Sequence, residues 1–444
     1  MVVKSINRRD FVRASALAAT ALAVPTIVPA HVLGKASPND TLRIGCIGTG
    51  RMGHGDMGEC LAQGLVGDNN ARIVAVCDLD SHRAQHAKQQ SEGTYARKLT
   101  EGSGPVIDVY SDYRELLARS DIDGVTISTP DHWHALVAIA AADAGKAIYL
   151  QKPLTYSIAE GRKLVEAVQR NNVILQTGSQ QRSDRRFRTA CELVRNGRVG
   201  KLHTIHVKLP TDSGIGNPQT VAAPANLNYD VWLGPTAVQP YAQDRVHPQA
   251  GFSRPGWLQI ESYCRGMITG WGAHMFDIAQ WGHGADGSVP VEVEATGEFP
   301  ERGLFNVHTD FSAELRYADG VRVIATSGDP AGVTFEGDAG SIHVTRSSIK
   351  ATPSKLLDDL VTDSDVRLYQ SDNHMGNFLQ CARSGKAPIC PVEVGHQANV
   401  VCVMVHIAMK LGRKLRWDPQ QEKFLGDDAA NEMLDYPHRQ PWVV

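Results

Sequence analysis

The sequence has almost no excess charge, because 45 lysines and arginines stand against 48 aspartates and glutamates, for a net charge of −3. A nucleic-acid-binding surface needs a clustered positive field, and the basic residues after position 40 are scattered among acids. This balance argues against a nucleic-acid partner. It is compatible with a small, weakly charged substrate.

Paired cysteine motifs and metal-ligand clusters are also missing. The eight cysteines form no C-x-x-C pair and no regular spacing, and Cys46 and Cys77 lie inside apolar, strand-like runs, as buried single cysteines do. His132 and His134, next to Asp131, are too close in sequence for the i, i+4 arrangement of two helical ligands, and no further cluster is evident. The sequence therefore predicts neither a disulfide framework nor a metal site.

The composition is that of a globular protein. Hydrophobic residues make up 42% and charged residues 21%, which argues against a disordered or fibrous chain. A length of 444 residues is sufficient for two domains, each with its own core. Internal repeats and low-complexity segments are absent after the N-terminal region. The boundaries that we predict are residues 1–36, 41–178 and 179–444.

The first of these segments has the pattern of an export signal. Arg8 and Arg9 precede the apolar, Ala-rich run 14–28, which ends in small residues. Pro25 and Pro29 would break an ordinary helix, and the run is shorter than the roughly 20 residues that span a bilayer. We therefore expect residues 1–36 to be a removed twin-arginine signal and linker. The Tat translocase would be a transient partner and the periplasm the destination of the folded protein.

Between residues 41 and 178, short apolar runs alternate with longer helical patterns. Asp112 is placed to cap a helix whose third residue is Glu115, as in a capping box. Such alternation predicts βαβ units and a doubly wound parallel sheet with right-handed crossovers. The predicted strands are residues 42–47, 72–77, 106–110, 124–128, 147–150 and 173–176, with helices such as 158–169 between them.

The pattern changes after residue 179. Runs that alternate apolar and polar residues, with turn signals such as that at 318–320, predict an α+β domain with a largely antiparallel open sheet. The stretch 210–256 is too long for a simple connection, and such loops are often functional. An exposed face on this sheet would favour a homo-oligomer, either a dimer or a tetramer. The predicted helices are 185–196, 373–384 and 394–412, the predicted strands are 202–209, 291–299, 309–317 and 322–327, and the tail from Trp417 onward is expected to wrap the surface.

A glycine-rich loop follows the first predicted strand and opens a helix. This context gives the G-x-G-x-x-G pattern its meaning, since the loop and helix N-terminus of a Rossmann domain bind the diphosphate of a dinucleotide. Asp78 ends the second strand, where a carboxylate accepts from a ribose hydroxyl and repels a 2′-phosphate. The pattern favours NAD over NADP, with NADP as the alternative. The loop consists of Gly48, Thr49, Gly50, Arg51, Met52 and Gly53.

Ligands of open parallel sheets bind outside the carboxyl ends of the strands. Lys152 follows a predicted strand and precedes Pro153, which restricts its backbone. Beside a nicotinamide it can have a lowered pKa and can hydrogen-bond a substrate hydroxyl. The alternative is a solvated lysine in a loop. Pro130 and the residues after it, including His134, would begin a helix under the nicotinamide. The full set of cofactor-binding candidates at these strand ends is Ser128, Thr129, Pro130, His134, Gln151 and Lys152.

A second candidate group lies on the predicted helix 270–281. His274 is a natural proton acceptor near neutral pH, and Asp277 lies three residues further along the same helix. The alternative is a buried histidine that Asp277 holds as packing. Aromatic residues of the long-loop region could stack on sugar faces or could form the packing core of the loop; these are Trp232, Tyr241, Trp257 and Tyr263.

These features together resemble the Gfo/Idh/MocA oxidoreductase family, which is named for glucose-fructose oxidoreductase, inositol dehydrogenase and a rhizopine-catabolism protein. The resemblance covers nearly all of the chain after the signal. It implies that Lys152 contacts the substrate hydroxyl and the nicotinamide, and that His274 is the catalytic histidine. It rests on the loop 48–53, the segment 128–134 (Ser-Thr-Pro-Asp-His-Trp-His), the tripeptide Gln151-Lys152-Pro153 and the segment 274–277 (His-Met-Phe-Asp).

The sequence departs from the family pattern at two positions. The usual tripeptide is Glu-Lys-Pro, so Gln151 removes a negative charge near the cofactor. Inositol-dehydrogenase-like members carry an Asp four residues before the catalytic histidine, where this chain has Gly270. Either His274 acts without that partner, or Tyr263 or Asp277 assists it.

The resulting expectation is hydride transfer between nicotinamide and a hydroxyl-bearing carbon of a sugar or polyol. Because free NAD is not expected to be replenished outside the cytoplasm, the cofactor would stay tightly bound. One alternative is a redox-neutral glycosidase that works by oxidation, elimination, addition and reduction, which some members of the resembled family do. A second is a non-catalytic sugar-binding protein that has kept the fold.

Overall fold

Two β-sheets organise residues 42–444, which fold as one unit. The computed structural model describes residues 40–100, 104–212, 214–358, 362 and 364–444. The twin-arginine segment predicted over residues 1–36 lies outside the described residues.

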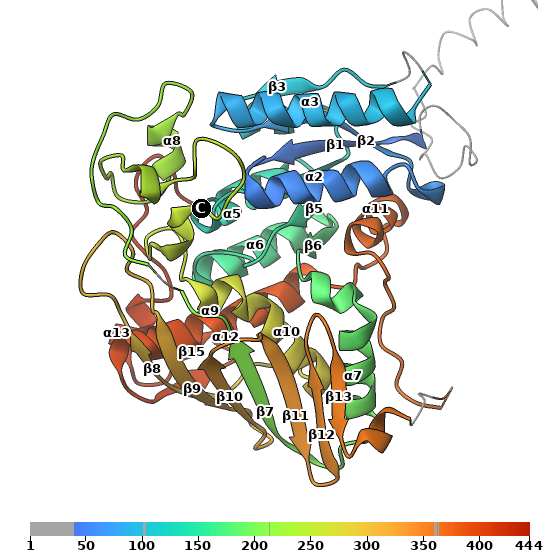
Figure 1. Cartoon of the computed structure of the whole chain (residues 1–444), viewed down its shortest axis with the longest axis vertical. Coiled ribbons are helices and arrows are strands. Elements are labelled where there is room, and N and C mark those ends of the chain that lie inside the picture. The colour runs from blue at the N-terminus through green and yellow to red at the C-terminus, as the bar shows by residue number, and fades with distance from the viewer. Residues whose placement is uncertain (1–39, 101–103, 213, 359–361, 363) are drawn as a thin grey trace, which may run out of the picture. The chain divides into compact units, whose positions relative to one another are not determined.

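The N-terminal sheet of the described chain is parallel throughout and has the strand order β3-β2-β1-β4-β5-β6 (Figure 1). This is the order of the Rossmann fold, and it confirms the predicted doubly wound sheet. Its strands are β1 (Leu42–Ile47), β2 (Ala71–Cys77), β3 (Asp108–Tyr110), β4 (Gly124–Ile127), β5 (Ala147–Leu150) and β6 (Leu175–Thr177).

Helices cover both faces of this sheet, which explains why its strands read as continuous apolar runs. Ile44 and Cys46 of β1 pack toward one face, whereas Ile47 packs toward the other. The first face is covered by α2 (Arg51–Gln63), α3 (Ser81–Lys98) and α11 (His374–Ser384), and the second by α4 (Tyr113–Leu117), α5 (Asp131–Asp143) and α6 (Ile158–Asn171). Because α11 belongs to the C-terminal half of the chain, that half contributes to the Rossmann layers.

Side-chain caps fix where some of these helices begin. Asp112 caps α4 as predicted, since its carboxylate accepts from the backbone N–H of Arg114 at 2.9 Å. A complete capping box lies at the start of α6. There the Ser157 hydroxyl accepts from the N–H of Glu160 and the Glu160 carboxylate accepts from the N–H of Ser157.

The C-terminal sheet is mixed but largely antiparallel, as predicted. Among the described residues it has the order β13-β12-β11-β7-β10-β9-β8-β14-β15, and only the β7–β10 pair is parallel. Its strands are β7 (Leu202–Leu209), β8 (Glu292–Glu298), β9 (Asp310–Arg316), β10 (Arg322–Ser327), β11 (Gly332–Gly337), β12 (Gly340–Val344), β13 (Ile349–Thr352), β14 (Leu415–Asp418) and β15 (Lys423–Phe424).

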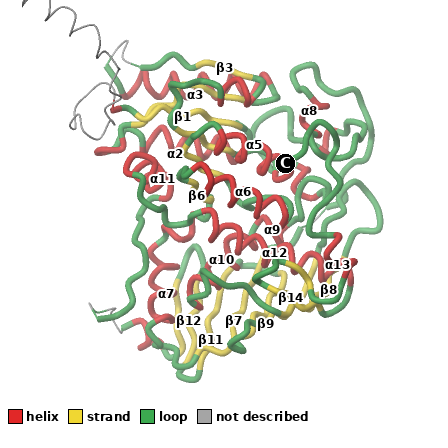
Figure 2. The backbone as a smooth tube through the Cα atoms, turned by 180° about the vertical axis from the view of Figure 1, so that it is seen from behind, coloured by secondary structure: helices red, strands yellow, loops and turns green. Residues whose placement is uncertain are grey.

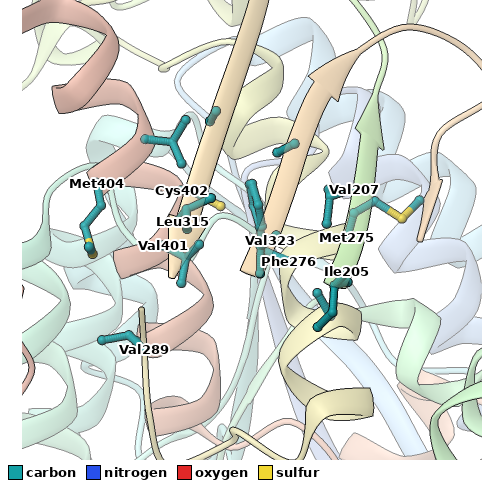
Figure 3. Close-up of a cluster of buried hydrophobic side chains, with 14 of the residues drawn as sticks. Ile205, Val207, Met275, Phe276, Val289, Leu315, Val323, Val401, Cys402 and Met404 are labelled. Atoms are coloured by element: carbon teal, nitrogen blue, oxygen red, sulfur yellow. The ribbon is translucent and has the colours of Figure 1, made fainter. Parts of the chain in front are cut away.

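One face of this sheet forms the largest core of the described chain. It packs against α7 (Arg185–Arg195), α10 (Gly272–His283) and α12 (Val392–Leu411). Figure 3 shows Val207 of β7 and Val323 of β10 facing Met275 and Phe276 of α10. Strand β9 alternates strictly between buried and exposed residues, so the opposite face carries polar side chains such as Glu314. The core thereby fixes α10, which carries His274.

The sequence analysis missed part of this sheet. Strands β11, β12, β13, β14 and β15 were not predicted, because these short runs lack a long alternating pattern. The tail was expected to wrap the surface from Trp417 onward, which was wrong for its first residues. Trp417 is 2% exposed and stacks edge-on against Phe424. Within the described residues, α12 is long and apolar enough to span a membrane, but it is mostly buried as the central core helix.

All eight cysteines are buried and free, as predicted. Among the described residues, no group of three or more His, Cys, Asp or Glu side chains could hold a metal ion.

Candidate active site

A cavity of about 480 Å³ lies at the carboxyl ends of the Rossmann strands. It is where ligands bind in open parallel sheets. Most of the cofactor-binding candidates line it, namely Gly48, Gly50, Arg51, Met52, Asp78, Ser128, Thr129, Pro130, Gln151 and Lys152. The other candidates do not line it; these are Thr49, Gly53, His134, Tyr263, His274 and Asp277.

The glycine loop has the backbone that a dinucleotide requires. Gly48 has a φ of +80°, and a Cβ there would press against the backbone of Ser128 at 2.7 Å. A Cβ on Gly53 would collide with the carbonyl oxygen of Gly48, so close helix–strand packing needs glycine here. Gly50 is the N-cap of α2 and supplies no side-chain cap. The first N–H groups of α2 are therefore available to a diphosphate, and the residues present fit a dinucleotide.

Asp78 is held at the cavity by the loop itself. One carboxylate oxygen accepts from the backbone N–H of Thr49 at 2.7 Å and from its hydroxyl at 2.9 Å. The other accepts from the N–H of Asp80 at 2.9 Å. Because a carboxylate has about four acceptor positions, Asp78 can still accept from ribose hydroxyls. Thr49 thus orients Asp78 and does not line the cavity.

Lys152 is half-buried on the cavity wall, and its ammonium has no hydrogen-bond or ion-pair partner among the residues that the structure describes. Burial lowers the pKa of Lys152, an effect that the charge of Asp131 opposes. A lysine with a lowered pKa can exchange a proton with a substrate hydroxyl near neutral pH. Lys152 therefore lies on the wall of the cavity rather than in a fully exposed loop.

Asp131 was not among the predicted site residues. It lines the same cavity and is 3% exposed. Burial raises its pKa to about 7, although the charge of Lys152 lowers it. Asp131 immediately follows Pro130 at the end of β4. That position at the rim was the signal that could have identified it, but the sequence analysis took it only as the start of a helix.

His274 is buried on α10 near the cavity, but does not line it. Its Nδ1 atom has no hydrogen-bond partner within the described chain. Burial lowers the pKa of His274 well below its usual value, and the charges of Lys152 and Arg346 lower it further. The ring is therefore neutral at physiological pH.

Gly270, by contrast, lines the cavity, and a Cβ at this position would meet nothing within 4 Å. The position of the missing family carboxylate is therefore open space. Asp277, one of the two predicted substitutes for it, does not line the cavity.

Asp277 and Tyr263 have hydrogen-bond partners other than His274. The Asp277 carboxylate accepts from the guanidinium Nε of Arg182 at 2.9 and 3.0 Å, and Arg182 also pairs with Asp286. This buried ion pair accounts for Asp277 without a catalytic role. The Tyr263 hydroxyl accepts from Arg245 at 3.5 Å, and its ring packs in the core of the long loop.

His134 lies under the rim. Its Nδ1 is 2.7 Å from the carbonyl oxygen of Pro153, and its Nε2 is 2.9 Å from that of Thr129. Burial lowers its pKa to about 4, so the ring is neutral and can donate through only one nitrogen. His134 thus links the loop after β4 to the loop after β5, and it helps to position Lys152 through its contact with Pro153, the next residue.

The long loop predicted to be functional lies over the cofactor end of the cavity. Its residues 226–252, which we call the strap, are tied to the β2–α3 turn. His247 Nε2 lies 2.9 Å from the Asp80 carboxylate, Asn226 donates to the same carboxylate at 2.9 Å, and Arg83 donates to the Pro248 carbonyl at 2.9 Å. Figure 2 shows this region around α8 (Tyr229–Leu233) as mostly loop.

The four candidate aromatic residues of this region differ in whether they reach the cavity. All four pack in the core of the loop, and Trp232 and Trp257 also line the cavity. Trp442 of the C-terminal tail also lines the cavity and packs edge-on against Trp133. In Figures 1 and 2 the C-terminus accordingly lies beside α5.

A Rossmann sheet with a fitting glycine loop and a strand-end lysine defines a dinucleotide-dependent α/β protein. Residues 42–179 match the NAD-binding Rossmann fold of an oxidoreductase family, and residues 199–444 match its C-terminal alpha/beta domain. The chain belongs to the Gfo/Idh/MocA oxidoreductase family.

Individual relatives match over shorter stretches. The chain is 31% identical over 166 residues to the myo-inositol 2-dehydrogenase of Thermotoga maritima, covering 37% of this chain and 44% of that protein. It is 31% identical over 182 residues to a glycosyl hydrolase family 109 protein of Shewanella pealeana, covering 37% of each. The matched part thus spans less than half the length of either relative.

A solved structure shares the fold over most of the chain. It is the WlbA dehydrogenase of Bordetella pertussis in complex with NADH and UDP-GlcNAcA, with a TM-score of 0.61 and 18% identity, and the match covers 85% of this chain and 99% of that one.

Proposed function

We propose that the protein is an NAD-dependent oxidoreductase that acts on a CH–OH group of a sugar or polyol. The observation that carries the proposal is the position of Lys152. Its half-buried ammonium, without a protein partner in the described chain, shares one cavity with the glycine loop and Asp78. Membership of the family and similarity to a myo-inositol 2-dehydrogenase support the substrate class.

Each group of this chain has a separate task. The N–H groups at the start of α2 hold the diphosphate, and Asp78 accepts from the ribose. When bound, NAD supplies the hydride acceptor. Lys152 in its neutral form takes the proton of the substrate hydroxyl while the carbon–hydrogen bond breaks as hydride, so that a carbonyl remains. His274 stays neutral beside the cavity and is not the base, because burial holds its pKa well below the usual value.

The experiment is to purify the protein, supply NAD, screen sugars and polyols, and compare Lys152→Ala with Lys201→Ala, an exposed lysine far along the chain. Removal of the Lys152 amine should reduce kcat by at least about 100-fold with NAD binding retained, and the control should be unchanged. Full turnover in the Lys152 variant would contradict the proposal. Cofactor binding without turnover of any substrate would favour the non-catalytic sugar-binding alternative.

The cavity favours NAD over NADP and favours a cofactor that is held tightly. Asp78 would repel a 2′-phosphate, although the guanidinium of Arg83 also lines the cavity. The strap lies over this end, which would slow release. Copurification of the nicotinamide with the protein, and its identification by mass, test both statements.

A redox-neutral glycosidase is the second candidate, and the similarity to a glycosyl hydrolase family 109 protein favours it. In that reaction the sugar would be oxidised, the aglycone eliminated, water added and the hydride returned, so tight cofactor binding would be needed. Release of an aryl alcohol from aryl glycosides without net reduction of NAD would identify it. Net reduction with simple sugars would identify the dehydrogenase.

Export by the twin-arginine route to the periplasm rests on the sequence of residues 1–36. Replacing Arg8 and Arg9 by Lys should retain the full-length protein in the cytoplasm, as cell fractionation would detect. Periplasmic delivery of that variant would contradict the proposed interaction with the Tat translocase.

A homo-oligomer, a dimer or tetramer, would use the outer face of the C-terminal sheet. In the described chain this face is polar rather than apolar, with residues such as Glu294, Glu314 and Arg316 exposed. Light scattering of the protein at low and high salt tests this, since an interface of charged groups weakens as salt screens it. A monomer at all concentrations would contradict it.

A further inference from the structure

A buried carboxyl group lies directly beneath the cofactor loop and is not explained by cofactor binding. Asp56 is the sixth residue of α2 and is 6% exposed. The Gln151 side-chain amide donates to both of its oxygens at 2.9 Å, and the Ser128 hydroxyl donates to one of them at 2.7 Å. Three segments of the rim, namely α2 and the loops after β4 and β5, thus converge on one carboxylate.

The other end of the Gln151 amide points to Lys152. Its Oε1 atom accepts from the backbone N–H of Lys152 at 3.2 Å. Because a side-chain amide has a donor end and an acceptor end, Gln151 acts as a rigid link between the Asp56 carboxylate and the backbone of Lys152. Gln151 is 3% exposed, so water does not compete for this link.

The charge of Asp56 also acts on Lys152. Burial raises the pKa of Asp56 to about 6, while the hydrogen bonds from Ser128 and Gln151 and the charge of Lys152 lower it. The negative charge in turn favours the protonated form of Lys152. The other titratable groups that face Asp56 are Glu59 and Cys60 on its own helix, Cys46 on β1 and Tyr149 on β5.

We propose that Asp56 and Gln151 form one carboxylate–amide pair that positions Lys152 and supplies the negative charge next to it. Asp56 is therefore a positioning residue that acts through Gln151. The proposal rests on the proposed function of Lys152. It adds that the pair, rather than either side chain alone, is the functional unit.

The pair can be inverted, which provides a sharp test. In the double variant Asp56→Asn/Gln151→Glu, a carboxylate at position 151 faces an amide at position 56, with one charge and the same kind of hydrogen bond. Asp56→Asn alone leaves two amides and no charge. Gln151→Glu alone places two carboxyl groups in contact, so that one of them must hold a proton.

We expect Asp56→Asn to lower kcat by about 10-fold to about 100-fold, with a smaller change in the KM for substrate. The kcat/KM profile should shift to lower pH, because Lys152 loses a negative neighbour. Gln151→Glu should lose activity progressively as pH rises. The double variant should recover to within about threefold of the wild type. Glu166→Gln is the control, since it removes an exposed carboxylate on α6 that is not among the groups facing Asp56, and it should leave kcat and the pH profile unchanged.

Two outcomes would overturn the inference. One is Asp56→Asn with wild-type kcat and pH profile; the other is a folded double variant, by circular dichroism and NAD binding, that is no better than the weaker single variant. Failure of the proposed function would look different, because Lys152→Ala would then retain activity.

Discussion

At the residue scale, burial sets the protonation states around Lys152. Removing the charge of Asp131, in Asp131→Asn, should lower the pKa of Lys152 further, because Asp131 favours the ammonium form. If neutral Lys152 is the base, the acid limb of the kcat/KM profile then moves to lower pH. The measurement is a pH–rate series on both proteins. If the acid limb of the profile stays in place or moves to higher pH, the charge of Asp131 does not act on the catalytic base.

The same substitution has a predictable effect on stability. An acid with a raised folded-state pKa binds its proton more tightly when folded, so its contribution to stability falls as pH rises between the unfolded value, about 4, and the folded value; the latter is about 7 for Asp131. Asp131→Asn removes this loss. Its free energy of unfolding should exceed that of the wild type by on the order of 1–3 kcal/mol at about pH 8 and by much less at about pH 4. Denaturant unfolding at both pH values tests the sign.

Also at this scale, a substitution of Asp277 tests whether this residue contributes to stability or to catalysis. Asp277→Asn leaves the buried guanidinium of Arg182 with Asp286 as its remaining acid partner, so the protein should lose about 3 kcal/mol of stability. The folded fraction should keep its kcat, since the Asp277 carboxylate bonds Arg182 and not His274. A selective loss of kcat with unchanged stability would instead restore the catalytic role that the sequence suggested.

At the element scale, α2 provides a matched pair of glycines. Gly53→Ala places a Cβ against the carbonyl of Gly48 and should abolish tight NAD binding and destabilise the fold by about 1–3 kcal/mol. Gly55 lies on the same helix, and a Cβ there meets nothing within 4 Å. Gly55→Ala should therefore raise stability by about 0.5–1 kcal/mol. Calorimetry and NAD titration on both variants make the comparison.

At the scale of the whole molecule, the strap joins sequence-distant parts of the chain beside the cavity. His247→Ala removes one tie to Asp80 but leaves the Asp80 cap of α3 intact. Loss of a charged hydrogen bond of about 1.5 kcal/mol should accelerate nicotinamide release by about tenfold. His203→Ala, an exposed histidine on β7, is the control. Equal release rates in the variant and the wild type would mean that the strap does not retain the cofactor.

The sequence determined the parts of this protein that depend on neighbouring residues. Apolar runs separated by helical patterns predicted the Rossmann sheet, because strands that are buried on both faces of a sheet appear in the sequence as continuous apolar runs. The G-x-G-x-x-G motif lies between a predicted strand and a predicted helix, and this order located Gly48 and Gly53 in the cofactor loop. Asp78 was located in the same way, because it ends the second predicted strand. Even Asp56 could have been found, because it shares the buried face of α2 with Gly53 and Cys60.

Tertiary structure decided which charges meet. Asp277 pairs with Arg182 and not with His274 one turn away, because α10 packs beside the 3-10 turn Gln180–Ser183, which carries Arg182. Asp131 and Lys152 enter one cavity only when β4 and β5 lie side by side. The physical reason is that hydrogen-bond and charge partners are fixed by the close packing of distant elements, whereas helices, strands and glycine turns are fixed largely by local geometry.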